Sequence, residues 1–320
     1  MMQSASKTQL TFETAQAIVA AHFRDGVLRS STELTGGFFS AAYRLDLADE
    51  RRFVVKIAPP PPVRVLRYER GIMRAEVEAL RLVRGKTSVP VPEVIAFDDT
   101  QILLPSPYFI MEFVEGVPLH TVRDALSSSI QTSIDRKLGR FVREISAIPG
   151  ETFGLLGNTQ FPTWRAAFDS LLRDVLSDGR EIGAALPRAA DALYEGAVRH
   201  FDCLDEVSVP WLVHWDLWDG NVFVDPASGE INGIIDFERA LWGDPLIELN
   251  FREYSDASAF GEGYGKAVLD TSARRLRRSL YDLYLYLIMV IEDDFRQYET
   301  HEITDWARGN LVRVLEELGL

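Results

Sequence analysis

The segment HWDLWDGN, residues 214–221, gathers polar side chains whose types and spacing suit phosphoryl transfer. Asp216 is followed five positions later by Asn221, and Asp236 lies beyond a predicted hairpin. Phosphoryl transfer needs a magnesium ion to neutralise phosphate charge, and Mg²⁺ prefers carboxylate and amide oxygens as ligands. We therefore predict that Asn221 and Asp236 bind Mg²⁺. Asp216 is the predicted catalytic base, which accepts the proton of an attacking hydroxyl.

The first half of the chain offers a cation for the phosphates of ATP. Lys56 lies in the predicted strand FVVKIA, on the face opposite the apolar residues that alternate along it. Burying an ammonium group among apolar neighbours is costly unless an anion accompanies it. We expect the phosphates of ATP to be one partner and the carboxylate of Glu76, in RAEVEAL, to be another. Glu78 is the competing choice, although it lies on a different face of the same predicted helix.

Two further segments are candidates for nucleotide binding. In TGGFFS, Gly36 and Gly37 permit close approach of the backbone and leave amides free for phosphate oxygens. A plain hairpin turn is the alternative interpretation of these glycines. PYFIMEFVEG is predicted to connect two lobes and to contact adenine. The groups assigned to that contact are the Glu112 carbonyl and the Val114 amide, with Met111 packed behind them.

The elements that must position these residues divide the chain into two parts. Up to about residue 115 the pattern indicates strands, in TELTGGFFSAAYRLDLA, RRFVVKIA, PEVIAFDD and PYFIMEFVEG, around one helix in ERGIMRAEVEALRLVRG. Beyond that point helical patterns dominate, including one with Thr163 as its N-cap, apart from a hairpin directly after residues 214–221. We therefore predict an α+β fold with a nucleotide-binding lobe of residues 1–115. A helical lobe of residues 116–320 is predicted to carry the catalytic loop and the acceptor site.

The composition, 47% hydrophobic and 26% charged over 320 residues, is that of an ordinary globular protein. The formal net charge of −14 argues against nucleic acid and anionic membranes as partners, because both require a basic surface. Cys203 is the only cysteine, so neither a disulfide framework nor a cysteine metal cluster is expected. The first residues lack the pattern of a signal peptide, which favours the cytoplasm. The apolar SLYDLYLYLIMVIEDDF is predicted to be a buried helix, because it is too short to cross a bilayer.

The motifs occur in the order of a known kinase family. LTGGFFSAAYRL, VVKIAP, the helix of Glu76, FIMEFVEG, HWDLWDGNVFVD and GIIDFERALWGDP together resemble the aminoglycoside phosphotransferase family over residues 33–250. These enzymes are small-molecule kinases with a protein-kinase-like fold. The resemblance implies a bilobal fold, dependence on ATP and Mg²⁺, and transfer of the γ-phosphate to a hydroxyl of an aminoglycoside or another aminated or polyhydroxylated acceptor. A choline, sugar or amino-acid kinase of the same family is the alternative.

Two departures from the family pattern bear on the substrate. The family often has Gly after the motif His and His-Pro before Gly-Asn, whereas this chain has Trp215 and Trp218-Asp219. The aromatic pair is expected to alter the acceptor site. Only a short run separates Asp236 from the next Gly-Asp-Pro, which leaves no room for the activation loop of a protein kinase. No protein substrate is therefore expected.

The acceptor is expected beside Asp216, between the helix that contains Trp164 and the region around Trp218. Carboxylates are numerous between residues 201 and 260, which favours a cationic or polyhydroxylated acceptor over an anionic one. The candidates for cation–π contacts with such an acceptor are Trp164, Trp215 and Trp218. The glycine-rich GEGYGKA is interpreted as a loop on the acceptor side.

Two other functions match parts of the pattern. A pseudokinase would bind nucleotide without turnover, but the chain retains the residues whose loss marks such a protein: Lys56, Asp216, Asn221 and Asp236. A metal-dependent hydrolase built around His214 would need further histidines, which are scarce. We expect His214 to shape its loop through hydrogen bonds and Asp244, in WGDP, to brace that loop.

Overall fold

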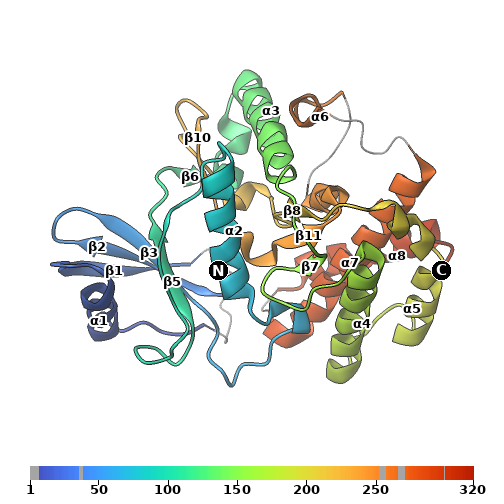
Figure 1. Ribbon diagram of the computed structural model, residues 1–320, viewed down its shortest axis with the longest axis horizontal. Helices are drawn as coiled ribbons and strands as arrows, with labels where there is room; N and C mark the ends of the chain where they lie inside the picture. Colours follow the sequence, from blue (N-terminus) through green and yellow to red (C-terminus); the bar gives the residue numbers. More distant parts are fainter. Residues whose placement is uncertain (1–6, 36–38, 252–256, 266–270, 299) are drawn as a thin grey trace.

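An antiparallel sheet forms one end of the molecule and helices form the other (Figure 1). The computed structural model describes residues 7–35, 39–251, 257–265, 271–298 and 300–320. The predicted α+β, bilobal, protein-kinase-like arrangement is confirmed, with a β-rich lobe followed by a mostly helical lobe. The exact division after residue 115 stays a prediction.

The sheet of the first lobe has the strand order β1-β2-β3-β5-β4, with every neighbouring pair antiparallel. Its strands are β1 (Leu28–Leu34), β2 (Ala41–Leu47), β3 (Arg52–Ile57), β4 (Val94–Asp98) and β5 (Tyr108–Glu112). Side chains alternate across a strand, so β3 buries Val55 on one face of the sheet and directs Lys56 to the other. The sheet therefore delivers Lys56 to the face that meets the rest of the protein.

Two helices flank this sheet, where only one was predicted. The helix α2 (Ile72–Lys86) is the expected one. The prediction of a single helix was wrong, because α1 (Phe12–His22) packs its apolar residues Ala15, Ile18 and Val19 beside the sheet core. Thr11 caps α1 by accepting a hydrogen bond from Thr14 N, which is a signal that the sequence did contain.

Short strands hold the segment 214–221 in the second lobe. One sheet joins β6 (Val117–Pro118), β9 (Val222–Val224) and β10 (Ile231–Ile234), and the other joins β7 (Gly154–Leu155), β11 (Leu241–Gly243) and β8 (Trp211–Val213). The predicted hairpin is confirmed as β9 and β10. Because β8 precedes the segment and β9 follows it, both of its ends are fixed. Asp236 comes just after β10, where the hairpin returns toward the same place.

The remaining helices belong to the second lobe. They are α3 (Ser128–Ile145), α4 (Trp164–Ile182), α5 (Ala190–Val198), α6 (Ala259–Tyr264), α7 (Ser272–Arg296) and α8 (Glu302–Glu317). Of these, α4, α5, α7 and α8 lie toward the end away from the sheet, and α3 and α6 lie at the top of the view (Figure 1). The predicted N-cap Thr163 is confirmed, since its hydroxyl accepts from Ala166 N at 3.3 Å. The interpretation of GEGYGKA as a loop was wrong for its described part, which forms much of α6 and packs on α3. Shorter 3-10 turns lie at Arg67–Glu69, Leu119–Thr121, Arg123–Ala125, Phe201–Glu206, Asp219–Asn221, Phe237–Arg239 and Pro245–Phe251.

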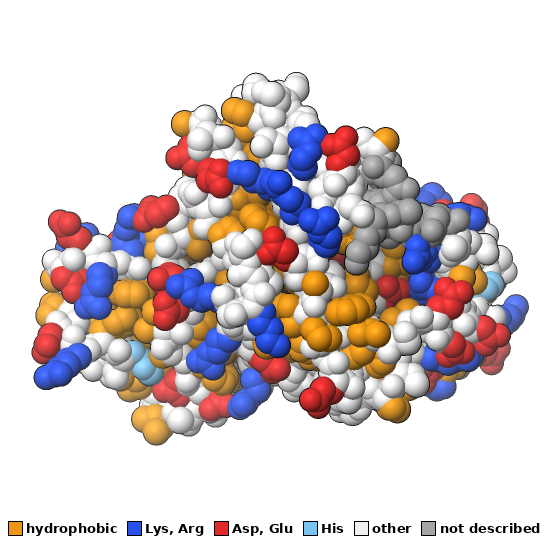
Figure 2. Space-filling model, turned by 45° about the horizontal axis from the view of Figure 1, so that its top comes forward, with side chains coloured by type: hydrophobic (Ala, Val, Ile, Leu, Met, Phe, Trp, Pro, Cys, Tyr) orange, Lys and Arg blue, Asp and Glu red, His pale blue; other side chains and the backbone are white. Residues whose placement is uncertain are grey.

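The long apolar helix α7 lies in the core, as predicted. Tyr284 and Leu287 are 1% and 0% exposed, so the apolar side chains of this helix pack within the lobe. None of the helices in the described part of the chain is both long and apolar enough to cross a lipid bilayer. On the face in Figure 2, acidic and basic side chains are interspersed apart from a short row of basic ones on the raised central part.

Candidate active site

The loop between β8 and β9 is shaped by His214. Its Nδ1 accepts a hydrogen bond from Asp216 N at 3.1 Å, and its Nε2 lies 2.9 Å from the Ile235 carbonyl oxygen. These partners require a neutral ring that carries its proton on Nε2. Burial agrees with that state, because it lowers the pKa of His214. The expectation that His214 shapes the loop is therefore confirmed, and its ring also ties the loop to the residue before Asp236.

Glu248 holds the backbone of this loop through two hydrogen bonds. Its Oε2 accepts from His214 N at 2.8 Å and from Trp215 N at 2.9 Å, where the backbone is forced into the left-handed region at φ 55°. The expectation that Asp244 would serve as the brace was wrong. Asp244 Oδ2 instead binds two side chains of α7, Arg277 Nε at 2.9 Å and the Tyr281 hydroxyl at 2.8 Å.

Asp216 and Asn221 face each other within the loop. Asn221 Nδ2 donates to the Asp216 carbonyl oxygen at 2.8 Å and to Asp216 Oδ2 at 3.2 Å. No hydrogen bond between described residues uses the amide oxygen of Asn221, so that oxygen is available to bind a metal ion. The pKa of Asp216 is raised well above its usual range by burial, which the positive charge of Arg239 opposes.

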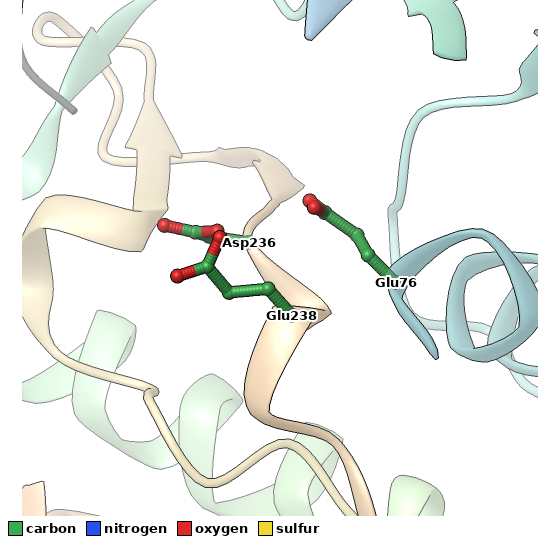
Figure 3. Close-up of side chains that lie close together, drawn as sticks. All are labelled: Glu76, Asp236 and Glu238. Atoms are coloured by element: carbon green, nitrogen blue, oxygen red, sulfur yellow. The ribbon is translucent and has the colours of Figure 1, made fainter. Parts of the chain in front are cut away.

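Lys56 joins the two lobes through carboxylates from distant segments. Its Nζ lies 2.6 Å from Glu76 Oε2, 2.6 Å from Asp236 Oδ1 and 3.0 Å from Glu238 Oε2. Figure 3 shows Glu76 reaching from α2 toward the segment that carries Asp236 and Glu238. The prediction that Glu76 rather than Glu78 pairs with Lys56 is confirmed, because Glu78 is exposed on the outer face of α2. Sequence reasoning missed Glu238, although it lies two positions after Asp236.

Burial and charge act against each other in this cluster. Burial disfavours the ammonium form of Lys56, but the three carboxylates outweigh it and raise the lysine pKa well above its usual range. Burial raises the pKa of Glu76 to about 8, despite the opposing charge of Lys56. Burial also opposes ionisation of Asp236, yet Lys56 holds the pKa of that carboxyl below its usual range. The pKa of Glu238 is raised by burial and by the charge of Asp236.

The cluster offers the donor set of a hard cation. One carboxylate oxygen from each of Glu76, Asp236 and Glu238 lies within 4.8 Å of the others. Carboxylate oxygens together with the Asn221 amide oxygen suit Mg²⁺, which prefers oxygen ligands. Asp236 also has a left-handed backbone, φ 69° and ψ 52°, a conformation that is strained for a non-glycine residue and concentrates at functional sites. These residues fit the predicted metal, and the ligand roles of Asn221 and Asp236 stay predictions.

The predicted adenine contact lies where β5 leaves the sheet. Met111 is 6% exposed and packs in the core, as expected of a residue behind the base. The Val114 N–H has no hydrogen-bond partner among the described residues, and its side chain packs against Gly233, where a Cβ would lie 2.6 Å away. Glu112 N donates to the Glu93 carbonyl at 3.0 Å, a bond that does not use the Glu112 carbonyl assigned to adenine. The nucleotide roles of Met111, Glu112 and Val114 stay predictions.

The glycine-rich segment is described only in part. Gly36 and Gly37 lie outside the described residues, so their predicted phosphate contact stays a prediction. The described chain resumes at Phe39 and Ser40. The Ser40 hydroxyl is buried and has no hydrogen-bond partner among the described residues. An unpaired buried hydroxyl is costly, which marks Ser40 as a candidate that sequence reasoning missed.

Two of the three tryptophans expected near the acceptor are in the core. Trp164 is 0% exposed and donates through Nε1 to the Tyr281 hydroxyl at 2.7 Å, while Trp215 is 0% exposed and stacks on Tyr284. The proposed cation–π contacts of Trp164 and Trp215 with an acceptor were therefore wrong. That the helix containing Trp164 forms a wall of the acceptor site stays a prediction. Apolar side chains tend to face the core, and the sequence did not reveal whether each indole ring points into the core or toward the acceptor site.

Trp218 is the tryptophan that remains at the surface, 36% exposed. Its ring lies so close to Gly220 that a Cβ there would be 2.1 Å from an indole carbon, so the glycine is required by close approach. The Trp218 ring also lies beside the His120 ring, at a distance of 5.2 Å between the ring centroids. Asp219, the next residue, forms an ion pair with Arg123. The departure from the His-Pro pattern therefore presents an indole held in a fixed position beside the loop.

Comparison with known sequences decides the family. Residues 30–281, most of the chain, match the profile of the phosphotransferase enzyme family. The chain belongs to this family. Its members that resemble this chain in fold are kinases, and the protein is accordingly a small-molecule kinase, which confirms the resemblance seen in the motifs.

Solved structures support the phosphotransferase fold. A candidate fructosamine-3-kinase from Thermobifida fusca is 20% identical, with a TM-score of 0.68 over 96% of this chain and 99% of that one. A candidate aminoglycoside phosphotransferase from Ralstonia eutropha is 14% identical, with a TM-score of 0.67 over 97% and 99%. The aminoglycoside phosphotransferase APH(4)-Ia, solved with AMP-PNP and hygromycin B, is 19% identical, with a TM-score of 0.65 over 96% and 99%. At these identities the likeness establishes the fold.

A longer curated protein contains a similar region. The probable acyl-CoA dehydrogenase IBR3 of Arabidopsis thaliana is 25% identical over 210 residues, which is 63% of this phosphotransferase and 24% of that protein. The chain therefore matches about a quarter of the length of this relative. The dehydrogenase name describes the longer protein.

Proposed function

We propose that this chain transfers the γ-phosphate of ATP to a hydroxyl of a small molecule, with Mg²⁺ as the required metal. One observation carries the proposal: Lys56 bonds to both Glu76 and Asp236, which are far apart in the sequence. The same hairpin that carries Asp236 is bonded to the loop of Asp216 and Asn221 through Ile235. The proposed cation, metal ligands and base thus come from segments that hydrogen bonds join, and this supports the proposal because phosphoryl transfer requires these groups together.

Nucleotide binding is assigned to the space between the two lobes. The backbone of Glu112 and Val114 would bind adenine, with Met111 behind it, and Gly36, Gly37 and Ser40 would contact the phosphates. APH(4)-Ia, which shares the fold, was solved with AMP-PNP, which supports ATP as the donor here. Lys56 pairs with three carboxylates, and we infer that it exchanges Asp236 and Glu238 for phosphate oxygens when ATP binds, while keeping Glu76.

Asn221 and Asp236 would hold the metal. Mg²⁺, when bound, neutralises charge on the β- and γ-phosphates and on the carboxylates around them. Glu238 lies close enough to Asp236 to share the task, since both contact Lys56 Nζ. The ligands come from two ends of one hairpin, so their relative position is fixed by the β9–β10 pairing.

Asp216 would act on the acceptor. Its carboxylate accepts the hydroxyl proton while the hydroxyl oxygen bonds to the γ-phosphorus and the bond from that phosphorus to the β–γ bridging oxygen breaks. The products are a phosphate monoester and ADP. Asn221 fixes the carboxylate through its 3.2 Å hydrogen bond to Oδ2. A positioned carboxylate needs little motion to take the proton, which is the contribution expected of a base.

The hydrolase alternative finds little support in the described residues. The histidines other than His214 are engaged elsewhere: His22 with Tyr108, His120 with Trp218, His200 with the Leu318 carbonyl and His301 with Asp293. A histidine-based metal centre beside Asp216 is therefore not favoured. We expect the reaction in the cytoplasm, with no protein substrate and no part for nucleic acid or membrane.

A binding experiment and a turnover experiment test this proposal. The melting temperature should rise with ATP and Mg²⁺ together, and the rise should vanish with EDTA or when zinc replaces magnesium. ADP release should then depend on an added hydroxyl compound. Equal stabilisation by ATP with and without Mg²⁺, or release of phosphate from esters in the absence of ATP, would contradict the assignment.

A further inference from the structure

The segment between β3 and α2, residues 59–71, crosses from the sheet to the helical lobe, and we call it the strap (Figure 1). Its run of prolines ends the strand, and its arginines then bind α4. Arg67 N donates to Asp178 Oδ2 at 2.8 Å, and its guanidinium forms ion pairs with Asp178 and Glu181. Arg64 Nη2 lies 3.2 Å from Glu181 Oε2. The strap is thus fastened to the lobe that carries Asp216.

A second set of contacts fastens the strap to the end of α7. Glu69, buried in the strap, forms an ion pair with Arg296, which also pairs with Glu292 one turn earlier in α7. The Arg296 guanidinium lies 5.0 Å from the centre of the Phe39 ring, next to the glycine-rich segment. These contacts bring the strap, α7 and the start of β2 together at one end of the site.

Docking of the strap places Tyr68 against Arg239. The Arg239 guanidinium lies 5.6 Å from the centre of the Tyr68 ring, and its Nη2 lies 3.7 Å from Glu292 Oε2. Arg239 follows Asp236 by three positions and supplies the main positive charge that stabilises the Asp216 carboxylate. Tyr68 therefore contacts the arginine whose charge acts on Asp216, the proposed base.

Arg239 is short of hydrogen bonds. A guanidinium has five N–H donors, but this one makes no hydrogen bond to any described residue, although its side chain is only 12% exposed. Its Nε is buried without a partner. An unsatisfied buried donor is costly, and a charged one more so. Because this guanidinium has an unpaired Nε and only the 3.7 Å ion pair with Glu292, we infer that it has donors left for an oxygen of the acceptor.

The surroundings of Arg239 select the kind of oxygen. An ammonium group has no lone pair to accept from Arg239. A carboxylate or phosphate of the acceptor would be repelled by the acidic groups around Arg239, which include Asp216, Asp236, Glu238 and Glu292. A neutral hydroxyl can accept from the guanidinium and donate to one of these carboxylates. The Tyr68 ring adds an apolar wall for the C–H face of a carbon skeleton.

We propose that Arg239 and Tyr68 form the acceptor-binding wall and that the acceptor is a neutral polyol, with one hydroxyl at Asp216 and a second bound by Arg239. This inference rests on the proposed kinase function. It narrows the expectation of a cationic or polyhydroxylated acceptor to the uncharged class. The strap makes the wall possible, because without its docking Tyr68 would not reach Arg239.

The test uses probes that share one carbon frame and differ in charge: glucose as the neutral polyol, glucosamine as the cation and gluconate as the anion. Sorbitol and myo-inositol extend the neutral set. ADP release is measured for the whole chain with ATP and Mg²⁺. A neutral polyol should give the highest kcat/KM. The inference is overturned if glucosamine or gluconate is the best acceptor, or if none of the probes is phosphorylated while ATP is bound and slowly hydrolysed.

Variants separate the wall from the nucleotide site. Arg239→Gln should raise the KM for the best polyol by about tenfold or more, while the KM for ATP stays within about twofold. Arg239→Lys should recover part of the loss, and Tyr68→Ala should also raise the polyol KM. The control is Arg199→Gln, an exposed arginine at the end of α5, which should leave both values unchanged. An Arg239→Gln enzyme with normal polyol KM, or with ATP and polyol KM raised equally, overturns the inference. Absence of any Mg²⁺-dependent ATP binding in the wild type would instead contradict the kinase function itself.

Discussion

Lys56 Nζ lies 2.6 Å from Glu76 Oε2, so a strand of the sheet and the helix α2 are joined by a buried ion pair. This approach, expected from the sequence to be within about 4 Å, is confirmed. Glu76 is 1% exposed, and its second oxygen, Oε1, has no hydrogen-bond partner among the described residues. Burying this carboxylate costs desolvation free energy. A role in orienting Lys56 toward phosphates would explain why it is there.

The ion pair leads to a first prediction. Lys56→Met should lower kcat/KM for ATP on the order of 10²-fold, because a charge that stabilises the transferring phosphate is lost. Adenosine, which has no phosphates, should still bind to the same extent. Glu76→Gln should cause a smaller loss than Lys56→Met, since the lysine remains. Equal kcat/KM in Lys56→Met and wild type would contradict the role of Lys56.

Asp236 provides a second prediction. Asp236→Asn should reduce ATP affinity in Mg²⁺ to the value that the wild type shows in EDTA, because the amide is a weaker ligand for a hard cation than the carboxylate. Calorimetric titration with and without Mg²⁺ measures the difference. Asp191→Asn, at an exposed side chain on α5, is the matched control and should leave the affinity unchanged. An Asp236→Asn affinity that still rises with Mg²⁺ as in the wild type would refute the ligand assignment.

The strap provides a third prediction, on stability. Asp178→Ala should lower the free energy of unfolding by about 2 kcal/mol, because it leaves the Arg67 N–H and guanidinium without their buried carboxylate. Asp191→Ala breaks an ion pair with Arg180 whose side chains are 82% and 60% exposed, and it should have no measurable effect. Urea unfolding of both variants makes the comparison. Equal stability of the two would mean that the contacts of Arg67 with Asp178 contribute nothing measurable to the docking of the strap.

The fourth prediction concerns pH. Burial raises the pKa of Glu69 from 4.5 to about 7, against the opposing charge of Arg296. Between these values the folded state holds a proton that the unfolded state has released, so stability from this group is lost as pH rises through that range. Glu69→Gln should therefore make the free energy of unfolding less dependent on pH between 5 and 7. The exposed Glu195→Gln serves as the control. Parallel curves for wild type and Glu69→Gln would count against this contribution.

Local patterns predicted much of the site. The alternation along FVVKIA placed Lys56 on the correct face of β3, and helical spacing separated Glu76 from the exposed Glu78. The hairpin predicted directly after residues 214–221 is present as β9 and β10. Each of these inferences depends on a period or a spacing that a few residues define by themselves.

Other features depended on contacts between distant segments. Glu238 reaches Lys56 from the turn after β10, in which Asp236 has a left-handed backbone. Tyr68 meets Arg239 only because the strap docks on the helical lobe, and no local pattern encodes that docking. Trp164 was assigned to the acceptor although it is buried, since helical periodicity alone does not tell a core from a cleft. Tertiary packing therefore decided what the sequence left open.

The central claim is that Asp216 serves as the base in transfer of phosphate from ATP to a hydroxyl. The most direct measurement follows the reaction of ATP, Mg²⁺ and a polyol by ³¹P NMR with wild type and Asp216→Asn. We predict a phosphate monoester signal that appears together with ADP, and a rate about 10²–10⁴-fold lower in the variant, with ATP affinity unchanged. A variant that forms the monoester at the wild-type rate, or a wild type that forms none from any hydroxyl compound, would contradict the account.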